Sequence, residues 1–360
     1  MGSMMANIRL LQENEFDAAI RLADSIFRDD EHRSMRDAYP FVFSPSLRQS
    51  YGVFVNNELV AFMGFVPAII QVGEARLHIY SIGAVCTHPD ARGNGYASQL
   101  LSSVFAHADA AGASLILVSG KRSLYARAGC YPFGRMKKYT LNQDNIRQIR
   151  SFSGDVGIRI REWRATDLFK LVELMRTRTA YYEQSVNDLA ALIRAEAFAS
   201  NVKMQHTLLV AERQGEPVAF VIMATGDKAS ARTPFIIEWA GEPEATAAIL
   251  GHAIRAYELP NLDIHVNWFE TGLNEVMESI PALSERNSGT VHIVNVEHLC
   301  NQLGPYWRAR STAGSDLATM LRDMDDSDRI ALLFDPTVGE DGHHSALPIP
   351  FPYTVGLNYV

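Results

Sequence analysis

The sequence predicts an α/β fold in the broad sense, which includes α+β folds. In this fold a mixed central sheet is flanked by helices. Strand and helix patterns alternate over roughly the first 120 residues. A glycine-rich stretch joins an apolar strand to an amphipathic helix, and the pattern begins again about 150 residues later. The chain has 360 residues. At about 150 residues per domain, this length suggests two or three domains.

The first predicted elements are a strand, a helix and a hairpin. Residues 8–10 have the character of a short strand. The helix predicted over residues 15–27 places four apolar residues at helical spacing, namely Phe16, Ile20, Ala23 and Phe27. Residues 52–66 then read as a hairpin, because polar residues 56–58 interrupt two apolar runs.

A further strand, a helix and a buried strand complete this region. Residues 80–85 continue as an extended segment, and residues 95–111 are predicted helical, with Leu100, Leu101, Val104 and Ala108 on one face. The continuous apolar run over residues 115–118 indicates a buried parallel strand. The predicted order is β-α-β-β-β-α-β.

A second region resembles the first. Residues 158–160 (Ile-Arg-Ile) resemble residues 8–10 (Ile-Arg-Leu), an offset of 158 − 8 = 150. Val-Ala-Phe recurs at residues 60–62 and 218–220, an offset of 218 − 60 = 158, the second time in a hairpin over residues 208–223. Two short matches can arise by chance in any α/β protein. We nevertheless predict a tandem repeat, with domains over residues 6–142 and 157–285.

The pattern changes again from about residue 290. We expect a strand over residues 291–296, a helix over residues 316–323 and a proline-rich end over residues 347–353. Residues 290–360 are therefore predicted to form a small C-terminal unit.

The most specific stretch runs from Val85 to Ala97, between a strand and a helix. The first backbone N–H groups of a helix have no internal partner and carry partial positive charge, so glycines there let a pyrophosphate approach the backbone. A dinucleotide-binding loop would place its third glycine at Ser98, and the Gly-Lys-Ser/Thr of a P-loop is absent. The stretch is thus a candidate anion site of another kind.

This stretch resembles motif A of the GNAT superfamily, Gln/Arg-x-x-Gly-x-Gly/Ala, with Arg92, Gly95 and Ala97 at the motif positions. The resemblance implies a catalytic GNAT acetyltransferase domain over residues 6–142, with acetyl-CoA as cosubstrate. It implies that the backbones of Val85 and Thr87 bind the pantetheine arm, with the Cys86 side chain facing away. The residues it assigns to the pyrophosphate are Arg92, Gly93, Asn94, Gly95, Tyr96 and Ala97.

A second GNAT-like element follows the buried strand, where Tyr125 and Gly129 match a Tyr-x-x-x-Gly-Phe/Tyr pattern. The resemblance places Tyr125 near the sulfur of coenzyme A. A phenol with a reference pKa of about 10 is a suitable proton donor to the departing thiolate. The alternative is that Tyr125 is a core aromatic residue, and for Tyr131 packing is the favoured interpretation.

The longer arrangement resembles the enhanced intracellular survival branch, in which a degenerate GNAT-like domain and a C-terminal domain follow the catalytic one. The segment 236–244 occupies the motif A position of the repeat but has no such loop, and its glutamates, Glu242 and Glu244, would repel a pyrophosphate. In that branch the terminal carboxylate reaches the active site. Here the corresponding carboxylate belongs to Val360. The alternative is that Val360 only ends a tail that packs on the domain surface.

The reaction expected from the resemblance is direct transfer of an acetyl group to a primary amine, and the leading hypothesis is the amine of a small molecule. Acetylation of a protein lysine or N-terminus, and a non-catalytic acyl-CoA sensor, remain open. An alkyl amine near pKa 10 must lose a proton. Besides Val360, the candidate bases are Asp29, Glu31, His32 and His78. A homo-oligomer is left open.

Composition excludes several other classes. The net charge of −8 argues against a nucleic-acid partner, and no apolar run reaches the ~20 residues that span a bilayer. The three cysteines are Cys86, Cys130 and Cys300. They are too few for a disulfide framework or a metal site and fit a reducing cytoplasm, as buried hydrophobic residues rather than a catalytic thiol.

Overall fold

The computed structural model describes residues 6–149, 157–226, 232–310, 314–336 and 347–360. The chain divides into two compact units. The first unit comprises residues 1–133, 288–349 and 359–360, and the second comprises residues 134–287 and 350–358. Residues from the C-terminal region therefore contribute to both units.

The sheet of the first unit follows the order β1-β2-β3-β4-β5-β14. Its neighbours are antiparallel except for the parallel pair β4 and β5. The strands are β1 (Asn7–Leu10), β2 (Tyr51–Val55), β3 (Glu58–Val72), β4 (Ala75–Thr87), β5 (Leu115–Val118) and β14 (Thr290–Ile293). This confirms the mixed sheet and the buried parallel strand that the sequence predicts.

The two hairpins of this sheet differ in how well the sequence marks them. Asn56 and Asn57 have φ angles of 52° and 66°, which suit the two-residue turn between β2 and β3. The second hairpin was not predicted: β3 continues to Val72 and reverses at Gly73, which has a φ of 52°. The extended segment predicted over residues 80–85 is thus the end of a longer strand.

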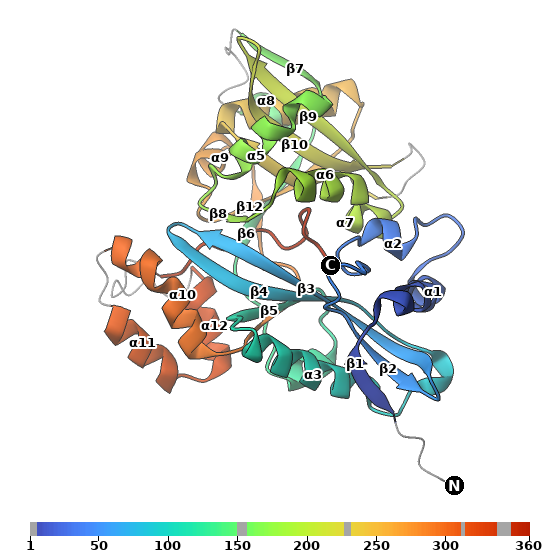
Figure 1. The fold of residues 1–360 in the computed structure, drawn as a ribbon. Helices are drawn as coiled ribbons and strands as arrows, with labels where there is room; N and C mark the ends of the chain where they lie inside the picture. The colour runs from blue at the N-terminus through green and yellow to red at the C-terminus, as the bar shows by residue number, and fades with distance from the viewer. Residues whose placement is uncertain (1–5, 150–156, 227–231, 311–313, 337–346) are drawn as a thin grey trace. The chain divides into compact units, whose positions relative to one another are not determined.

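Helix α3 (Tyr96–Ala110) packs on this sheet (Figure 1), as its periodicity predicts. Its residues Leu100, Leu101 and Val104 are buried with Phe65 of β3 and Ile82 of β4. The other helices of the N-terminal part are α1 (Phe16–Phe27), α2 (Met35–Ala38) and α4 (Ser123–Arg127).

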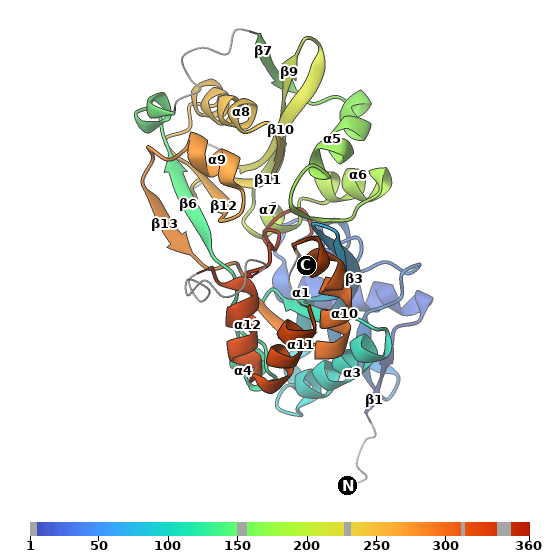
Figure 2. The same cartoon turned by 90° about the vertical axis from the view of Figure 1, so that its left-hand side faces the viewer.

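Three C-terminal helices belong to the first unit and group near α3 and α4 (Figure 2). They are α10 (Val296–Ala309), α11 (Gly314–Asp323) and α12 (Asp326–Phe334). The predicted strand over residues 291–296 is wrong at its end, because Asn295 caps α10 by accepting from the backbone N–H of Glu297 at 2.9 Å. The helix predicted over residues 316–323 is confirmed as part of α11.

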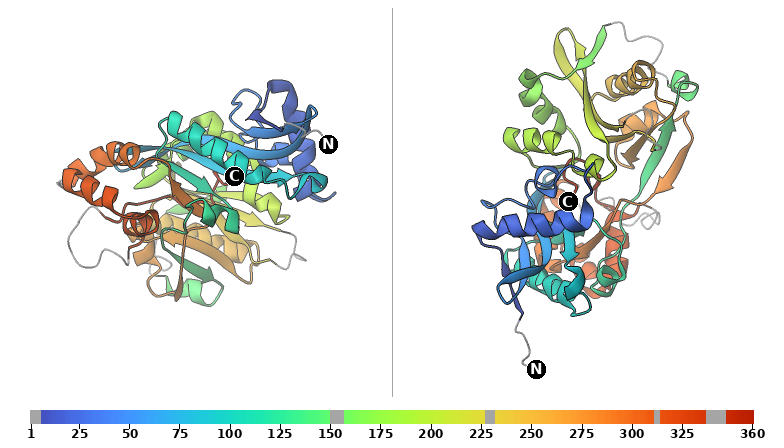
Figure 3. Two further views of the ribbon diagram at one scale, coloured as in Figure 1. Left: turned by 90° about the horizontal axis from the view of Figure 1, so that it is seen from below. Right: turned by 90° about the vertical axis from the view of Figure 1, so that its right-hand side faces the viewer.

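The second unit has its own seven-stranded sheet, in the order β13-β6-β12-β11-β10-β9-β7. These strands are β6 (Met136–Leu141), β7 (Ile158–Glu162), β9 (Gln205–Arg213), β10 (Glu216–Thr225), β11 (Phe235–Gly241), β12 (Leu262–Asn267) and β13 (Ala282–Glu285). Figure 3 shows β6 and β13 side by side, consistent with their antiparallel register. The short strand β8 spans Ala180–Tyr182.

Helix α8 packs on this second sheet, in the same sequence position relative to its strands as α3 in the first unit. The helices of the second unit are α5 (Leu168–Met175), α6 (Val186–Ala195), α7 (Ala197–Asn201), α8 (Pro243–Ala256) and α9 (Thr271–Val276). The predicted second hairpin is confirmed as β9 and β10.

An ion pair at the start of each unit supports the tandem repeat. Arg9 binds both carboxylate oxygens of Glu15 at 2.7 Å, and Glu15 accepts from the N–H of Gln12. Arg161 binds both oxygens of Asp167 at 2.8 Å, and Asp167 accepts from the N–H of Arg164. The offsets agree, since 161 − 9 and 167 − 15 are both 152.

The first sheet takes a strand from beyond the second unit. Strand β6 follows α4 directly and pairs with β12 and β13, so the strands of the second sheet come from one continuous stretch, residues 134–287. Strand β14 lies beyond β13 in sequence yet pairs with β5 of the first sheet. The first sheet is therefore completed only by residues that follow the second unit's strands.

Candidate active site

The candidate site begins where β4 separates from β5. Their parallel register runs from Ile79 opposite Leu115 to Ile82 opposite Val118, whereas β4 itself continues to Thr87. The register between β3 and β4 also shifts at this level, and Ala84 has a φ of 50°. Such a bulge bends a strand. The last residues of β4 therefore have an edge that β5 does not occupy.

The direction of the β4 backbone determines which groups face this edge. The N–H of His88 donates to the carbonyl of Val60 at 2.8 Å, so His88 faces β3. Because backbone groups of successive strand residues point to alternate sides, Thr87 faces the opposite side, and Val85 shares its orientation. These are the two residues predicted to bind pantetheine, and the structure presents their backbone groups at the open edge.

Cys86 lies between them and contributes no side chain to that edge. It is buried, and burial raises the pKa of its thiol to about 12. A thiol with this pKa is not a nucleophile at neutral pH. Cys130 and Cys300 are also buried.

The glycine-rich loop follows β4 directly and is exposed. Gly93 and Gly95 have φ angles of 82° and 74°, and a β-carbon built on Gly93 would meet no atom within 4 Å. Gly95 is the N-cap residue of the 15-residue helix α3 and offers no side chain to cap it. No side chain of the N-cap residue therefore occupies the start of α3, as an anion site requires. Arg92 and Asn94 are exposed beside them.

Tyr125 lies on the short helix α4 and is 5% exposed. Its ring packs so closely on the backbone of Gly120 that a β-carbon there would lie 2.8 Å from Cε2. Burial raises the pKa of the phenol, which keeps the group protonated and able to donate. The same burial places Tyr125 in the core cluster with Leu100 and Val118, so packing and proton donation are both consistent with its position.

The last two residues of the chain lie at the point where β4 and β5 separate. A β-carbon on Gly83 of β4 would lie 2.2 Å from the carboxyl carbon of Val360 and 2.6 Å from its oxygen. Tyr359 hydrogen-bonds to Ser119, the residue that follows β5. Burial raises the pKa of Tyr359, an effect that this hydrogen bond opposes. Its ring centroid is 6.4 Å from that of Tyr39.

Sequence reasoning missed Gly83, Ser119 and Tyr359 as parts of this arrangement. A glycine inside a strand marks either a bulge or the close approach of another backbone, and here Val360 makes that approach. Gly83 was therefore a usable signal, although the sequence does not show which segment approaches it.

The remaining candidate bases are placed elsewhere by their own contacts. His32 Nδ1 is 2.7 Å from Asp29 Oδ1 in the turn after α1, and Glu31 donates its backbone N–H to the same oxygen. His78 is exposed on β4, five residues before Gly83, which corresponds to roughly 16 Å along a strand. Among the candidates, Val360 is the one for which a contact at the strand opening is shown, through Gly83.

The second unit lacks the loop. The N–H of Glu242 donates to the carbonyl of Val218 at 3.0 Å, as His88 does to Val60. Residues 89–95 then separate His88 from α3, whereas α8 begins at Pro243, directly after Glu242. Pro243 has no N–H to offer, and Glu242 and Glu244 place negative charge at the helix start.

Within the ranges given above, no three His, Cys, Asp or Glu side chains are arranged to hold a metal ion. None of the helices that the structure describes is long and apolar enough to cross a membrane. The open strand edge, the exposed glycine loop and the adjacent helix define a class of protein, the acyltransferases that use an acyl-coenzyme A.

Residues 7–133 match the family model for the acetyltransferase (GNAT) domain. This match supports transfer of an acyl group from an acyl-coenzyme A as the reaction of the domain. The sequence matches no curated protein.

Solved structures share the fold over both units. A GCN5-related N-acetyltransferase from Anabaena variabilis has a TM-score of 0.64 at 14% identity, over 83% of this chain and 75% of that one. One from Kribbella flavida has a TM-score of 0.61 at 16% identity, over 83% and 73%. Eis1 from Mycobacterium abscessus has a TM-score of 0.58 at 14% identity, over 83% and 76%. The fold of the enhanced intracellular survival branch is thereby confirmed.

Proposed function

We propose that this protein transfers the acetyl group of acetyl-CoA directly to a primary amine of a small molecule. The observation that carries the proposal is the open edge of β4 at Val85 and Thr87, immediately followed by the exposed loop from Arg92 to Ala97. The loop would hold the pyrophosphate and the strand edge the pantetheine arm. The thioester would then lie near Gly83, where β4 and β5 separate.

The carboxyl group of Val360 is the proposed base. When the amine nitrogen bonds to the acetyl carbon, the carbon–sulfur bond breaks and the amine loses a proton. In water a carboxylate is a weak acceptor for that proton, with a pKa near 3.5 against about 10 for the ammonium. Exclusion of water from a site favours the uncharged forms of a carboxyl group and an amine, which eases this proton transfer. The close approach of Val360 to Gly83 supports this assignment.

Tyr125 is the proposed acid. Its phenol would give a proton to the departing thiolate, and both groups would be restored by exchange with water. The raised pKa of Tyr125 keeps the proton available before transfer. A backbone N–H at the β4 edge would polarise the thioester carbonyl.

Two other functions remain candidates, acetylation of a protein lysine or N-terminus, and acyl-CoA sensing without catalysis. The experiment that separates them incubates the purified protein with acetyl-CoA and three panels of acceptors: small amines, lysine peptides and peptides with free N-termini. Released thiol is measured. We expect turnover with the small amines. Turnover confined to peptides would replace the small-molecule proposal, and binding of acetyl-CoA without turnover on any panel would favour the sensor.

A further inference from the structure

Strand β14 contacts both ends of the segment that carries Tyr125. At the start of that segment, Thr290 Oγ1 donates to the carbonyl of Gly120 at 3.4 Å. At its end, His292 Nδ1 lies 3.1 Å from the carbonyl oxygen of Gly129. Between them, Val291 exchanges two backbone hydrogen bonds of 2.9 Å with Tyr131. A strand more than 150 residues away in sequence therefore brackets the tyrosine.

The bracketed segment needs such support. Helix α4 has only five residues, Ser123–Arg127, and one turn of helix is not stable without tertiary contacts. Its last carbonyl groups have no partner within the helix. Gly129, with a φ of 75°, turns the chain away, and its carbonyl is the one that His292 binds. The position of Tyr125 thus depends on contacts from outside α4.

His292 is well held for this purpose. Because a carbonyl oxygen only accepts, Nδ1 must carry the proton. Its ring stacks on Phe105 of α3, with centroids 4.1 Å apart and planes 9° from parallel. Burial lowers the pKa of His292, while the Gly129 hydrogen bond and the charge of Asp326 oppose that shift, so the imidazole is neutral near pH 7. The stacking and the hydrogen bond together restrict rotation of the His292 ring.

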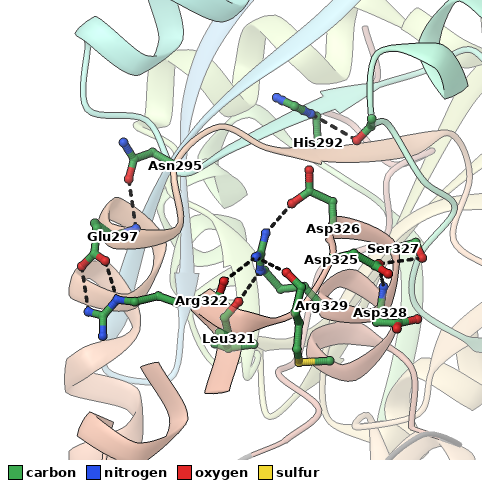
Figure 4. Close-up of polar contacts among 12 residues, drawn as sticks. His292, Asn295, Glu297, Leu321, Arg322, Asp325, Asp326, Ser327, Asp328 and Arg329 are labelled. Atoms are coloured by element: carbon green, nitrogen blue, oxygen red, sulfur yellow. Dashed lines mark hydrogen bonds and ion pairs between the residues drawn. The ribbon is translucent and has the colours of Figure 1, made fainter. Parts of the chain in front are cut away.

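Residues of helix α12 also lie next to Gly129 and His292 (Figure 4). Asp326 Oδ2 would lie 3.8 Å from a β-carbon on Gly129, and its other oxygen pairs with Arg329. Arg329 is buried and donates through Nε to the carbonyl of Leu321 at 2.6 Å, which ties α12 to the end of α11. The C-terminal helices thus fix the residues that surround His292 and Gly129.

We propose that His292 is a positioning residue for Tyr125, acting through the carbonyl of Gly129. The proposal rests on the proposed function, because it requires Tyr125 to be the proton donor. It gives the C-terminal region a role in the chemistry of the first unit: β14 sets the distance between the phenol and the departing thiolate.

The test compares His292→Phe with wild type. Phenylalanine keeps the stacking on Phe105 and removes only the hydrogen bond. Since a displacement of about 1 Å can cost about 100-fold in rate, we expect kcat to fall by roughly 10- to 100-fold, with KM for acetyl-CoA unchanged. His292→Asn, whose amide can donate near the position of Nδ1, should recover much of the loss. The matched control is His298→Phe, because His298 also meets a carbonyl, that of Ala113 at 3.3 Å, but not on the Tyr125 segment.

The Tyr125→Phe variant separates the two proposals. If Tyr125→Phe keeps full kcat, the role of Tyr125 itself is wrong. If Tyr125→Phe is slow while His292→Phe turns over like wild type, the positioning role of His292 is overturned. If His292 acts through Tyr125, adding His292→Phe to Tyr125→Phe should cause little further loss. Should His292→Phe not fold, His292→Leu tests the same contact, since leucine cannot donate to the carbonyl of Gly129, and an unchanged kcat there contradicts the proposal.

Discussion

The two units build the same strand-to-helix connection in different ways. In the first unit, β4 ends at Thr87, and a loop with two glycines at positive φ leads to α3. In the second, β11 ends at Gly241, and α8 starts at Pro243 with glutamates on either side of the proline. The sheet and the helix survive without the loop. The loop is therefore not required by the fold, and its glycines need an explanation in ligand binding.

A second difference concerns the helix that follows the next strand. Helix α4 carries Tyr125 at its third position, whereas α9 carries Leu273 at its third position. Both side chains are buried, so each position serves the core. Only the first unit adds a hydroxyl to it. Both differences thus fall at positions to which the proposed function assigns a role.

The largest effect on acetyl-CoA affinity is expected from Gly95→Asn, which tests whether only the first unit binds acetyl-CoA. Asparagine tolerates positive φ, so the change mainly places a side chain over the helix start. Loss of two charge-assisted hydrogen bonds costs about 3 kcal/mol or more, a reduction in affinity of at least about 100-fold. Calorimetric titration should show one site in wild type and none in the variant.

The control for this change is Gly112→Asn, because Gly112 has the same φ of 74° and open space around it, at the other end of α3. Gly112→Asn should bind normally. Residual tight binding to Gly95→Asn would assign coenzyme A to another place and would end the contrast between the units.

The largest effect on kcat is expected from Tyr125→Phe. Loss of a general acid predicts a kcat about 10²–10⁴-fold lower, with little change in acetyl-CoA affinity. The matched variant is Tyr139→Phe in the second unit. Tyr139 is also buried, burial raises its pKa, and it donates to Asn274 at 2.9 Å. Steady-state kinetics of both should separate them. Equal losses would indicate that buried phenols serve stability in both units.

A smaller effect is expected at the tail. Gly83→Ala would push the carboxyl group of Val360 away from β4, since its β-carbon would lie 2.2 Å from the carboxyl carbon. We expect kcat/KM to fall at least about 10-fold, with acetyl-CoA binding and thermal stability retained. A short polar extension after Val360 should have the same effect.

The comparison variant is Gly356→Ala, because Gly356 belongs to the second unit and its β-carbon would lie 3.0 Å from the Glu238 carboxylate and 3.3 Å from the carbonyl oxygen of Ile237, a milder crowding than at Gly83. It should remain active. Full activity of a C-terminally extended protein would rule out the catalytic role of the Val360 carboxylate.

The smallest effect on activity is expected from the repeated ion pair, which should alter stability alone. The side chains of Arg161 and Asp167 are 9% and 6% exposed, against 32% and 19% for Arg9 and Glu15. Asp167→Asn should cost about 2 kcal/mol, less than a fully broken buried pair because Glu212 still faces Arg161. Glu15→Gln should cost less than about 1 kcal/mol. Urea unfolding followed by tryptophan fluorescence would measure both.

The pH dependence of this contribution follows from the pKa of Asp167. The hydrogen bond from Arg161 holds that pKa below its usual value, despite burial. Its stabilisation is therefore present above the unfolded pKa of about 4 and is lost as the pH falls through the lower, folded value. The difference between wild type and Asp167→Asn should accordingly shrink in acid, and a difference that persisted there would contradict the assignment.

Local features of the site could be predicted from the sequence, and long-range ones could not. Arg92, Gly95 and Ala97 form a motif within six residues. Tyr125 lies on a short helix, and Gly129 lies just after that helix. The contact of Val360 with Gly83 and that of His292 with Gly129 join residues more than 160 positions apart. No local pattern encodes such contacts, because they depend on which strand completes which sheet.

Two helices were also missed for identifiable reasons. Helix α10 contains Gly304 and Pro305, which disfavour a helix when judged locally. Burial of Leu299, Leu303 and Trp307 outweighs that cost in the folded chain. Helix α12 is short and has two acidic residues in its first turn, and its start is set by Asp325, which caps it through the N–H of Asp328 at 3.0 Å.

The pairing of β14 with β5 has a consequence for the synthesis of the protein. Strand β5, an unbroken Leu-Ile-Leu-Val run, gains its second neighbour only when residues 290–293 leave the ribosome. At about 5–20 residues per second, that is a wait of roughly 10–30 s. During that time an apolar strand edge is open to pairing with other chains. A nascent chain stalled before residue 290 should therefore aggregate or recruit chaperones, although its first 140 residues contain every motif of the acetyltransferase domain.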